Sequence, residues 1–454
     1  MSNRPKVLSS VVDNDLCIGC GLCTYKCPSD ALKMKWNDLG FLVPDVVGDC
    51  CNEGACLTVC PFNPDERDAS KNETGLAKIF LTDTTETHEK LGRFIGIYAG
   101  YSKEYRPTSS SGGIASYVFE KLLENNVVDH IISVGQSKTN DAHYEYVIKS
   151  SKEDLKAVSK TKYYPVTLAT ILPQIKTLEG KIAIVGVACF VKAIRLAQNS
   201  DPYLKQKIPF VAGIICGGVK SRFFTEYLAS KAGADIHSFQ QPDYRVKDAN
   251  STASDYSFKC TDNNTDKLIK MQSVGDMWGT GLFKANACDF CDDVTTELAD
   301  ISLGDAWLEP FNNDGLGTNV IISRSILADQ IINNGITKGE LDVERLPLTA
   351  MLSSQQGSFN HRHDGLYERI KENKGNDIPT PKKRFGNKRL LPDVLLVQKL
   401  RRVARKQSLN YWKNLPTATS FDKSMKKILV ALRIATKINH FRKAPLKKLK
   451  RLVK

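Results

Sequence analysis

The sequence predicts a small cysteine-rich α+β module, then an α/β domain with a mixed sheet, then a basic helical C-terminal extension. Eight of the thirteen cysteines lie between Cys17 and Cys60. From Arg93 onward, apolar strands alternate with helical segments, which favours an α/β domain around a largely buried sheet. Residues 381–454 carry 23 Lys or Arg against two acidic residues. Since the net charge of the chain is +14, residues 1–380 carry −7.

Changes in composition predict four segments, which are the module at 8–65, a polar linker at 66–92, the main domain at 93–375 and the extension at 376–454. Apolar runs in the main domain predict strands at 93–101, 127–135, 144–149, 181–187 and 208–216, and helices at 111–124, 190–197 and 222–232. Residues 236–324 are richer in strand signals, at 238–246, 255–260, 301–305 and 318–323.

The sequence contains no run of eighteen apolar residues, so no membrane span is expected. Its start leads into no apolar signal core, so export is not expected either. We therefore expect a cytoplasmic protein. In a reducing compartment, closely spaced cysteines predict metal ligands rather than disulfides, and their odd total agrees with ligation.

The first cysteine motif reads Cys17-Ile-Gly-Cys20-Gly-Leu-Cys23-Thr-Tyr-Lys-Cys27-Pro28. This is the C-x2-C-x2-C-x3-C-P spacing of bacterial ferredoxins. Three thiolates at this spacing wrap one face of a [4Fe-4S] cluster, while the fourth lies too far along and serves a second cluster. Zinc, which also binds paired C-x2-C, is the alternative.

The second motif reads Cys50-Cys51-Asn52-Glu53-Gly54-Ala55-Cys56-Leu57-Thr58-Val59-Cys60-Pro61. Glu53 occupies a position where the spacing calls for cysteine. The first cluster is then expected on Cys17, Cys20, Cys23 and Cys60, and the second on Cys27, Cys50 and Cys56. Its fourth ligand is left open between Cys51, Glu53 (a poorer ligand for iron) and a degenerate site without a stable cluster.

Five further cysteines are scattered along the main domain. Cys189 and Cys216 each follow an apolar strand, at the edge of an α/β sheet where ligands collect. Together with the chelating pair Cys288 and Cys291, they predict a third [4Fe-4S] cluster. Buried free cysteines, or a redox-active Cys288/Cys291 pair, are the alternatives. Cys260 has no evident partner.

A loop with the sequence Ser110-Ser111-Gly112-Gly113 precedes a predicted helix. Its amides and small side chains can form an anion site, although the residues alone favour an ordinary capped helix. No G-x-G-x-x-G follows a strand, so a Rossmann cofactor site is not supported.

From Arg93 onward the chain resembles the family of coenzyme F-420 hydrogenase/dehydrogenase beta subunits. The resemblance rests on residues 109–115, 160–165, 184–189, 213–216, 244–247, 288–291 and 299–307. Residues 184–189 read Ile-Val-Gly-Val-Ala-Cys, where the family usually has Gly-Thr-Pro-Cys. With the cysteine module, the resemblance covers roughly residues 10–330.

The resemblance implies a flavin enzyme that passes electrons between a ferredoxin-type donor and a small organic acceptor, such as a deazaflavin-type coenzyme or a tetrapyrrole, through [4Fe-4S] clusters and FAD. Related bacterial proteins occur in surface-polysaccharide settings. The expected cofactor-binding residues are Ser110, Ser111, Gly112, Gly113, Lys160, Lys162 and Gly186.

Lys162 and Asp305 are the expected catalytic residues. Lys160 and Lys162 would neutralise phosphate or stabilise negative charge on reduced flavin, with plain surface lysines as the alternative, and Asp305 would contact flavin or relay a proton. Arg245 is expected either to grip a substrate anion or to form a structural ion pair. The run His361-Arg362-His363 lacks metal-site spacing and is expected at the surface.

The C-terminal extension mixes apolar residues with Lys and Arg over 422–453, a pattern that favours helices with one cationic face. Such helices suit an anionic membrane surface or an acidic partner. Nucleic acid is the rival partner, which we do not expect, and a solvated tail is the simplest alternative. Pro445 is expected to break any single long helix.

Two other functional classes remain open. One is an electron-transfer subunit with no small-molecule substrate of its own. The other is an iron–sulfur protein that binds nucleic acid through its basic extension.

Overall fold

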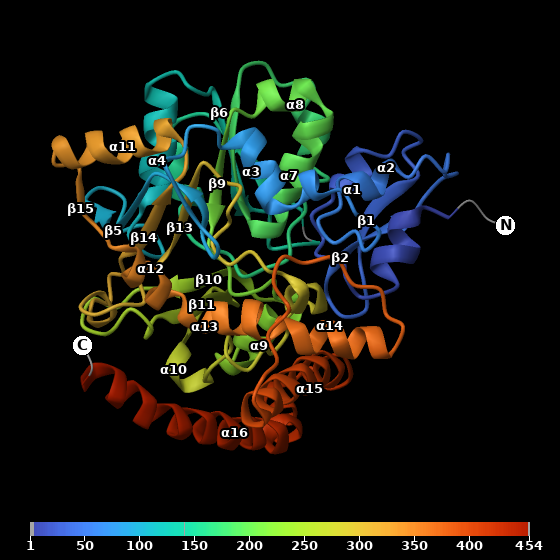
Figure 1. The fold of residues 1–454 in the computed structure, drawn as a ribbon, viewed down its shortest axis with the longest axis vertical. Coiled ribbons are helices and arrows are strands. Elements are labelled where there is room, and N and C mark those ends of the chain that lie inside the picture. Colours follow the sequence, from blue (N-terminus) through green and yellow to red (C-terminus); the bar gives the residue numbers. More distant parts are fainter. Residues whose placement is uncertain (1–3, 140, 453–454) are drawn as a thin grey trace.

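The structure, a computed structural model, describes residues 4–139 and 141–452. Its centre is an eight-stranded mixed sheet with the order β15-β5-β14-β13-β9-β8-β6-β7 (Figure 1). In that order the strands are Leu341–Arg345, Gly96–Ser102, Asn319–Ser323, Ile301–Asp305, Phe210–Ile214, Ile182–Val187, His130–Gln136 and Tyr144–Lys149.

The four central strands of this sheet, β13, β9, β8 and β6, pair in parallel, and the outer pairs are antiparallel. Central strands are buried on both faces, which explains their nearly continuous apolar sequences. The mixed α/β fold predicted from the sequence is therefore confirmed, and each strand predicted between 127 and 323 has its counterpart.

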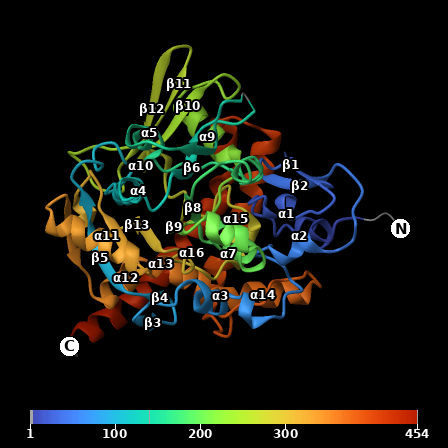
Figure 2. The same ribbon diagram turned by 90° about the horizontal axis from the view of Figure 1, so that it is seen from above.

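Helices cover both faces of the sheet (Figure 2). Side chains of α4 (Ile114–Glu124), α5 (Lys152–Val158) and α11 (Ile326–Thr337) pack with Ile131 of β6 on one face. On the other face, α6 (Leu172–Ile175), α7 (Ala188–Ser200) and α8 (Pro202–Lys207) pack with the neighbouring residue Ile132. Successive strand residues point to opposite faces, so both faces need apolar cover.

The cysteine module lies beside α7 (Figure 1). Its elements are the π-helix η1 (Leu8–Val12), the strands β1 (Leu32–Trp36) and β2 (Leu42–Val46), and the short helices α1 (Leu22–Tyr25) and α2 (Ala55–Thr58). Strands β1 and β2 pair antiparallel. The apolar core of the module continues into the α7 face of the sheet without a break.

The segment expected as a polar linker, 66–92, is largely folded. It contains the 3-10 helix η2 (Ala69–Lys71), helix α3 (Glu73–Phe80) and strand β3 (Glu86–His88), which pairs with β4 (Gly92–Phe94). Glu73 is buried and its carboxylate lies 2.9 Å from Nζ of Lys192 and 3.6 Å from Nε of Arg384. The expectation that residues 66–92 form an unstructured linker is therefore wrong. Ion pairs with distant parts of the chain hold this polar segment in place.

A second sheet lies beyond the central one and consists of three antiparallel strands, β10 (Gln240–Val246), β11 (Ser257–Asp262) and β12 (Thr265–Lys270). The remaining elements before the C-terminal extension are α9 (Arg222–Lys231), α10 (Met271–Val274), η3 (Asn286–Phe290), η4 (Phe311–Asn313), α12 (Leu348–Ser354), α13 (Gln356–Phe359), η5 (Asn360–Asp364) and α14 (Leu366–Gly375).

Two long helices form the C-terminal extension, α15 (Pro392–Asn414) and α16 (Ala418–Leu452). Trp412 is fully buried and its indole N–H donates to Glu226 on α9 over 2.8 Å, which anchors the pair to the body. Helix α16 continues through Pro445, so the expected break is wrong. A proline removes one helical hydrogen bond, and a helix can tolerate this with a local distortion. Within 4–139 and 141–452, no helix combines the length and the apolar character needed to cross a bilayer.

The run His361-Arg362-His363 is not at the surface. Arg362 and His363 are buried, with exposed fractions of 3 % and 4 %. The expectation is wrong because backbone carbonyl groups of residues 216, 292 and 293 accept hydrogen bonds from these polar side chains inside the protein.

Candidate functional site

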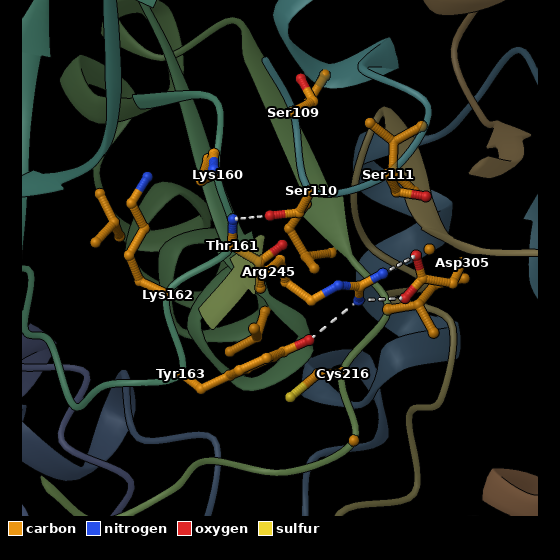
Figure 3. Close-up of a pocket in the computed structure, with 18 of the residues that line it drawn as sticks. Ser109, Ser110, Ser111, Lys160, Thr161, Lys162, Tyr163, Cys216, Arg245 and Asp305 are labelled. Atoms are coloured by element: carbon orange, nitrogen blue, oxygen red, sulfur yellow. Dashed lines mark hydrogen bonds and ion pairs between the residues drawn. The ribbon is translucent and has the colours of Figure 1, made fainter. Parts of the chain in front are cut away.

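A cavity of about 890 Å³ opens where the ends of β8, β9 and β13 meet the N-terminus of α4 and the segment 158–164 (Figure 3). Arg245 of β10, Tyr256 just before β11 and the region around Trp278 complete its wall. The position is the carboxyl edge of the parallel strands, which is where α/β sheets place their ligands. Cavities of this volume accommodate cofactors and drug-sized molecules.

The serine loop, residues 109–113, forms one wall of the cavity (Figure 3). Ser110 Oγ accepts a hydrogen bond from the backbone N–H of Thr161 over 2.8 Å. The buried hydroxyls of Ser109 and Ser111 have no hydrogen-bond partner within the described residues. Gly113, with φ of +78°, precedes α4 and offers no side chain to cap it; Asn319 Oδ1 accepts from the N–H of Ile114 over 3.2 Å at this helix N-terminus, which lies beside the cavity.

Gly112 has a packing role rather than a place in the cavity wall. A Cβ atom there would lie 2.5 Å from the carbonyl oxygen of Gly100. Glycine therefore lets the serine loop approach β5 closely. Lys247, which sequence reasoning left without a role, holds the loop from the other side by donating to the carbonyl oxygens of Arg106 and Ser111, both over 2.6 Å.

Three of the predicted site residues bring charge to the cavity wall. Lys160 pairs with Asp243 over 2.5 Å, and Arg245 forms a bidentate pair with Asp305 over 2.9 and 3.2 Å (Figure 3). The alternative of a structural ion pair for Arg245 is thus confirmed, and Asp305 is its partner. Nε of Arg245 is buried without a partner among the described residues.

Lys162 is the predicted residue with the least compensated charge. Its Nζ donates only to the carbonyl oxygen of Val158, over 3.2 Å, in the described part of the chain. Burial lowers its pKa to about 7, although Asp243 acts in the opposite direction. A lysine with such a pKa can hold or release a proton near neutral pH.

Residues that the sequence did not single out line the rest of the cavity. Tyr163 and Trp278 meet edge to face with ring centroids 4.7 Å apart. Lys220 donates to the carbonyl oxygens of Met277 and Leu282 over 2.7 and 2.5 Å. These residues come from separate segments, so no local pattern marks them. Gly186, predicted for cofactor binding, and Trp307 also line the cavity.

The third cysteine group, Cys189, Cys216, Cys288 and Cys291, comes together beside the cavity. Burial raises the pKa of Cys189 well above its ordinary value, and the neighbouring charges of Cys291, Cys288 and Cys216 raise it further. Cys216 also lines the cavity (Figure 3). The four thiols therefore lie near one another, and their ligation of a third cluster stays a prediction.

Backbone N–H groups and the guanidinium of Arg362 face the sulfurs of the third group. Gly218 N–H donates to Cys216 Sγ and Val219 N–H donates to Cys288 Sγ, both over 3.2 Å. The guanidinium of Arg362 lies 3.6 Å from Cys291 Sγ and also donates to the carbonyl oxygen of Cys216. Such donors favour thiolates over thiols, as metal ligation requires.

The first cysteine group, Cys17, Cys20, Cys23 and Cys60, forms inside the module. Burial raises the pKa of Cys23 well above its ordinary value, and Cys20, Cys17 and Cys60 raise it further. Gly19 N–H donates to Cys17 Sγ over 3.4 Å. Cys60 therefore lies near the first three cysteines, while the predicted division of ligands between the two clusters stays a prediction.

The second cysteine group contains Cys27, Cys50 and Cys56. After burial, the charges of Cys27 and Cys50 raise the pKa of Cys56. Cys51 and Glu53, the two candidates for a fourth ligand, are both exposed.

In the part of the chain that the structure describes, no three His, Cys, Asp or Glu side chains form a site for a single metal ion.

The three groups follow one another toward the cavity. Cys56 of the second group acts electrostatically on Cys23 of the first, and Cys20 of the first acts on Cys189 of the third. Since Cys216 lines the cavity, the order runs from the second group through the first and third to the cavity wall.

Comparison with known proteins agrees with these features. Residues 10–33 match a 4Fe-4S binding domain, so the chain is of the iron–sulfur class. Residues 97–173 and 179–348 match the N-terminal and C-terminal parts of the beta subunit of coenzyme F420 hydrogenase/dehydrogenase, together more than half of the chain. The protein belongs to this family of iron–sulfur oxidoreductases.

Two curated proteins are similar over most of the chain. Coenzyme F420-dependent sulfite reductase of Methanocaldococcus jannaschii is 23 % identical over 75 % of this chain, which spans only 49 % of that protein. A subunit of the F(420)H(2) dehydrogenase of Methanosarcina mazei is 23 % identical over 69 % of this chain and 83 % of its own length.

The fold also resembles that of a solved chain. A chain in the F420-reducing [NiFe] hydrogenase complex of Methanosarcina barkeri matches 66 % of this chain and 99 % of its own length. The TM-score is 0.50 and the identity is 16 %, so this likeness concerns the fold alone.

Proposed function

We propose that the protein is an iron–sulfur flavoprotein oxidoreductase in which [4Fe-4S] clusters exchange electrons with a flavin held in the cavity. The observation that carries this proposal is the position of Cys216, which belongs to the third cysteine group and also lines the cavity. A redox centre ligated there would adjoin any cofactor bound in the cavity.

The proposed ligands are the eleven cysteines of the three groups. Backbone N–H donors at Cys17, Cys216 and Cys288 support ligation, because such hydrogen bonds stabilise cluster sulfur and tune its potential. The second site would have three cysteine ligands. With Cys51 and Glu53 both exposed, solvent or one of these two side chains would complete it.

The cavity fits a dinucleotide such as FAD in its volume and in its chemistry. Ser109, Ser111 and Arg245 line the cavity, and Ser109 Oγ and Ser111 Oγ have no partner within the described residues, so a rotation of either serine side chain would offer a free hydroxyl to a polar ligand. The N-terminus of α4, with Ser110 and Gly113 beside it, would hold the pyrophosphate. Bound flavin would supply the exchange between single electrons and electron pairs that organic reductions need.

Lys162 would hold or release a proton at Nζ near the reacting atoms, because its pKa lies near neutrality. Asp305 stays a predicted catalytic residue. Its bidentate pair with Arg245 holds both charged groups in fixed positions at the cavity wall. Lys160, tied to Asp243, would contribute positive charge for phosphate.

A deazaflavin-type coenzyme is the organic acceptor we favour, since two relatives are named for coenzyme F420. A ferredoxin or another redox protein would be the electron donor at the cysteine module. No finding bears on a role in surface-polysaccharide metabolism, which stays a prediction. An electron-transfer subunit without its own substrate is the alternative, because one relative is named as a subunit.

The proposal is tested by measuring FAD bound to anaerobically purified protein and the dissociation constant of FAD for the variant Ser109→Ala/Ser111→Ala. Loss of two hydroxyl hydrogen bonds predicts about a tenfold or greater rise in Kd. Ser353→Ala, which removes an exposed serine that does not line the cavity, is the control and leaves Kd unchanged. Protein that neither contains nor binds flavin would overturn the proposal.

The acceptor is tested separately with the flavin-loaded protein. Reduction of a deazaflavin coenzyme by reduced ferredoxin in its presence supports the enzyme. Protein that accepts electrons from ferredoxin but reduces no small molecule would instead support the electron-transfer subunit.

A further inference from the structure

Helix α16 carries a row of exposed apolar side chains on its outer side. Val430, Ile434, Ile438 and Phe441 have exposed fractions between 43 and 75 %. At 3.6 residues per turn they fall within about 80° of one another around the helix axis. Together they form one stripe, which we call the outer stripe.

The opposite side of α16 packs against the body. Phe421, Met425, Leu432 and Ala435 are buried there, in the same core as Trp412 and Phe283. In Figure 1 the helix runs along the rim of the molecule, away from the central sheet. Helix α16 therefore has two apolar sides. One packs against the body of the protein, and the other, the outer stripe, takes no part in this packing.

Cations surround the outer stripe on the same side of the helix. Lys426, Lys427, Arg433 and Lys437 are exposed, and none of them forms an ion pair within 4–139 and 141–452. Asp422 is the only acidic residue in the sequence of α16, and it pairs with Lys231 on α9 over 2.8 Å. The outward side thus combines large apolar groups with unopposed positive charge.

We propose that α16 is a membrane-binding helix that lies flat on an anionic phospholipid bilayer, with the outer stripe at the level of the upper acyl chains. Lysines and arginines beside the stripe would extend their stems upward and place their charges among the lipid phosphates. A bilayer fits better than nucleic acid, because phosphate recognition alone gives no reason to expose four large apolar side chains.

The test uses the full chain and sedimentation with vesicles of phosphatidylcholine alone or mixed with phosphatidylglycerol. Binding to the mixed vesicles, weakened by salt, is the expected result. Ile434→Ser/Ile438→Ser/Phe441→Ser should lower the partition coefficient by more than about tenfold, since each side chain contributes buried apolar area. Leu268→Ser/Ile326→Ser, which removes exposed apolar side chains elsewhere, is the control and should bind normally.

The charge arm uses Lys426→Gln/Arg433→Gln/Lys437→Gln, which should also lose binding by about tenfold or more. The control is Lys138→Gln/Lys156→Gln/Lys338→Gln, which removes three exposed cations from other surfaces. It has the same net charge as the α16 charge variant and should bind vesicles normally. All four variants should keep the iron content of the native chain, so this test stands apart from the proposed function. Equal losses in test and control variants, absence of vesicle binding, or binding to a nucleic-acid duplex in place of vesicles would overturn the proposal.

Discussion

The backbone N–H of Leu168 donates a hydrogen bond of 3.0 Å to the carbonyl oxygen of Cys20. This bond joins the main domain to the first cysteine group at the residue that also acts electrostatically on Cys189 of the third group. The two groups are therefore held by the fold itself, and electron transfer between them would need no domain movement.

Gly21 tests this junction, because a Cβ atom there would lie 2.3 Å from Thr167 Oγ1 and 2.8 Å from the backbone nitrogen of Ala169. Gly21→Ala should lower the free energy of unfolding by about 2–4 kcal/mol, from left-handed backbone strain plus the clash. It should also slow electron transfer from the module to the cavity. Urea unfolding and stopped-flow reduction measure the two effects.

Gly54 provides a matched control, since it also precedes a short helix, with φ of +71° against +81° for Gly21. A Cβ atom at Gly54 would meet no atom closer than 3.6 Å. Gly54→Ala should therefore cost only the backbone strain, about 1 kcal/mol. Equal effects of the two substitutions would contradict the proposed role of the Gly21 contact.

Arg362 should raise the reduction potential of a cluster on the third cysteine group, because its cation lies 3.6 Å from Cys291 Sγ and favours the more negative, reduced state. Arg362→Gln should shift that potential by tens of millivolts to more negative values, as followed by a redox titration with electron paramagnetic resonance. Arg362→Lys, which keeps the charge, should shift it less. A positive shift for Arg362→Gln would show that the cation does not act in this way.

Replacing Lys162 by Met should raise the free energy of unfolding, by an amount that depends on pH. Burial lowers its pKa from the ordinary 10.5 to about 7, so the cost of the buried ammonium is fully present below pH 7. That cost falls as the pH rises from about 7 toward 10.5. The folded protein has released the proton in this range, and the unfolded chain comes to release it as well. Lys162→Met should therefore raise the free energy of unfolding by a few kcal/mol at pH 6 and by less at pH 9.

Thermal unfolding of the flavin-free protein at several pH values measures this effect. Lys160→Met serves as the comparison, because Lys160 is paired with Asp243 and its loss should give no such gain. A stability gain for Lys162→Met that grows with pH would contradict the sign of the predicted shift. The same variant should bind FAD less tightly below pH 7, where Lys162 carries its charge.

Much of the sheet could be predicted from the sequence, because its central strands are short apolar runs between turn signals. Strand β8 (182–187) was expected at 181–187 and β7 (144–149) was expected with the same bounds. The gathering of Cys189 and Cys216 could also be foreseen, since both follow parallel strands and parallel strands end at one edge.

Other features depend on contacts between distant residues and leave no local signal. Helix α3 is polar, and its Glu73 is held by Lys192 and Arg384 from other parts of the chain. Arg362 is buried because Cys216 and Asp293 offer backbone carbonyl groups to it, 146 and 69 residues away. The outer stripe of α16 could be foreseen only as amphipathic character, since the sequence does not say which apolar side faces the body.

Iron content tests the central claim most directly. Anaerobically purified protein should contain about twelve irons per chain, in three [4Fe-4S] clusters. Cys216→Ser/Cys288→Ser should contain about eight and should transfer electrons from reduced ferredoxin to the cavity far more slowly. Cys260→Ser, a buried cysteine outside the three groups, should keep about twelve. About eight irons in the native chain, or no loss in Cys216→Ser/Cys288→Ser, would contradict the account.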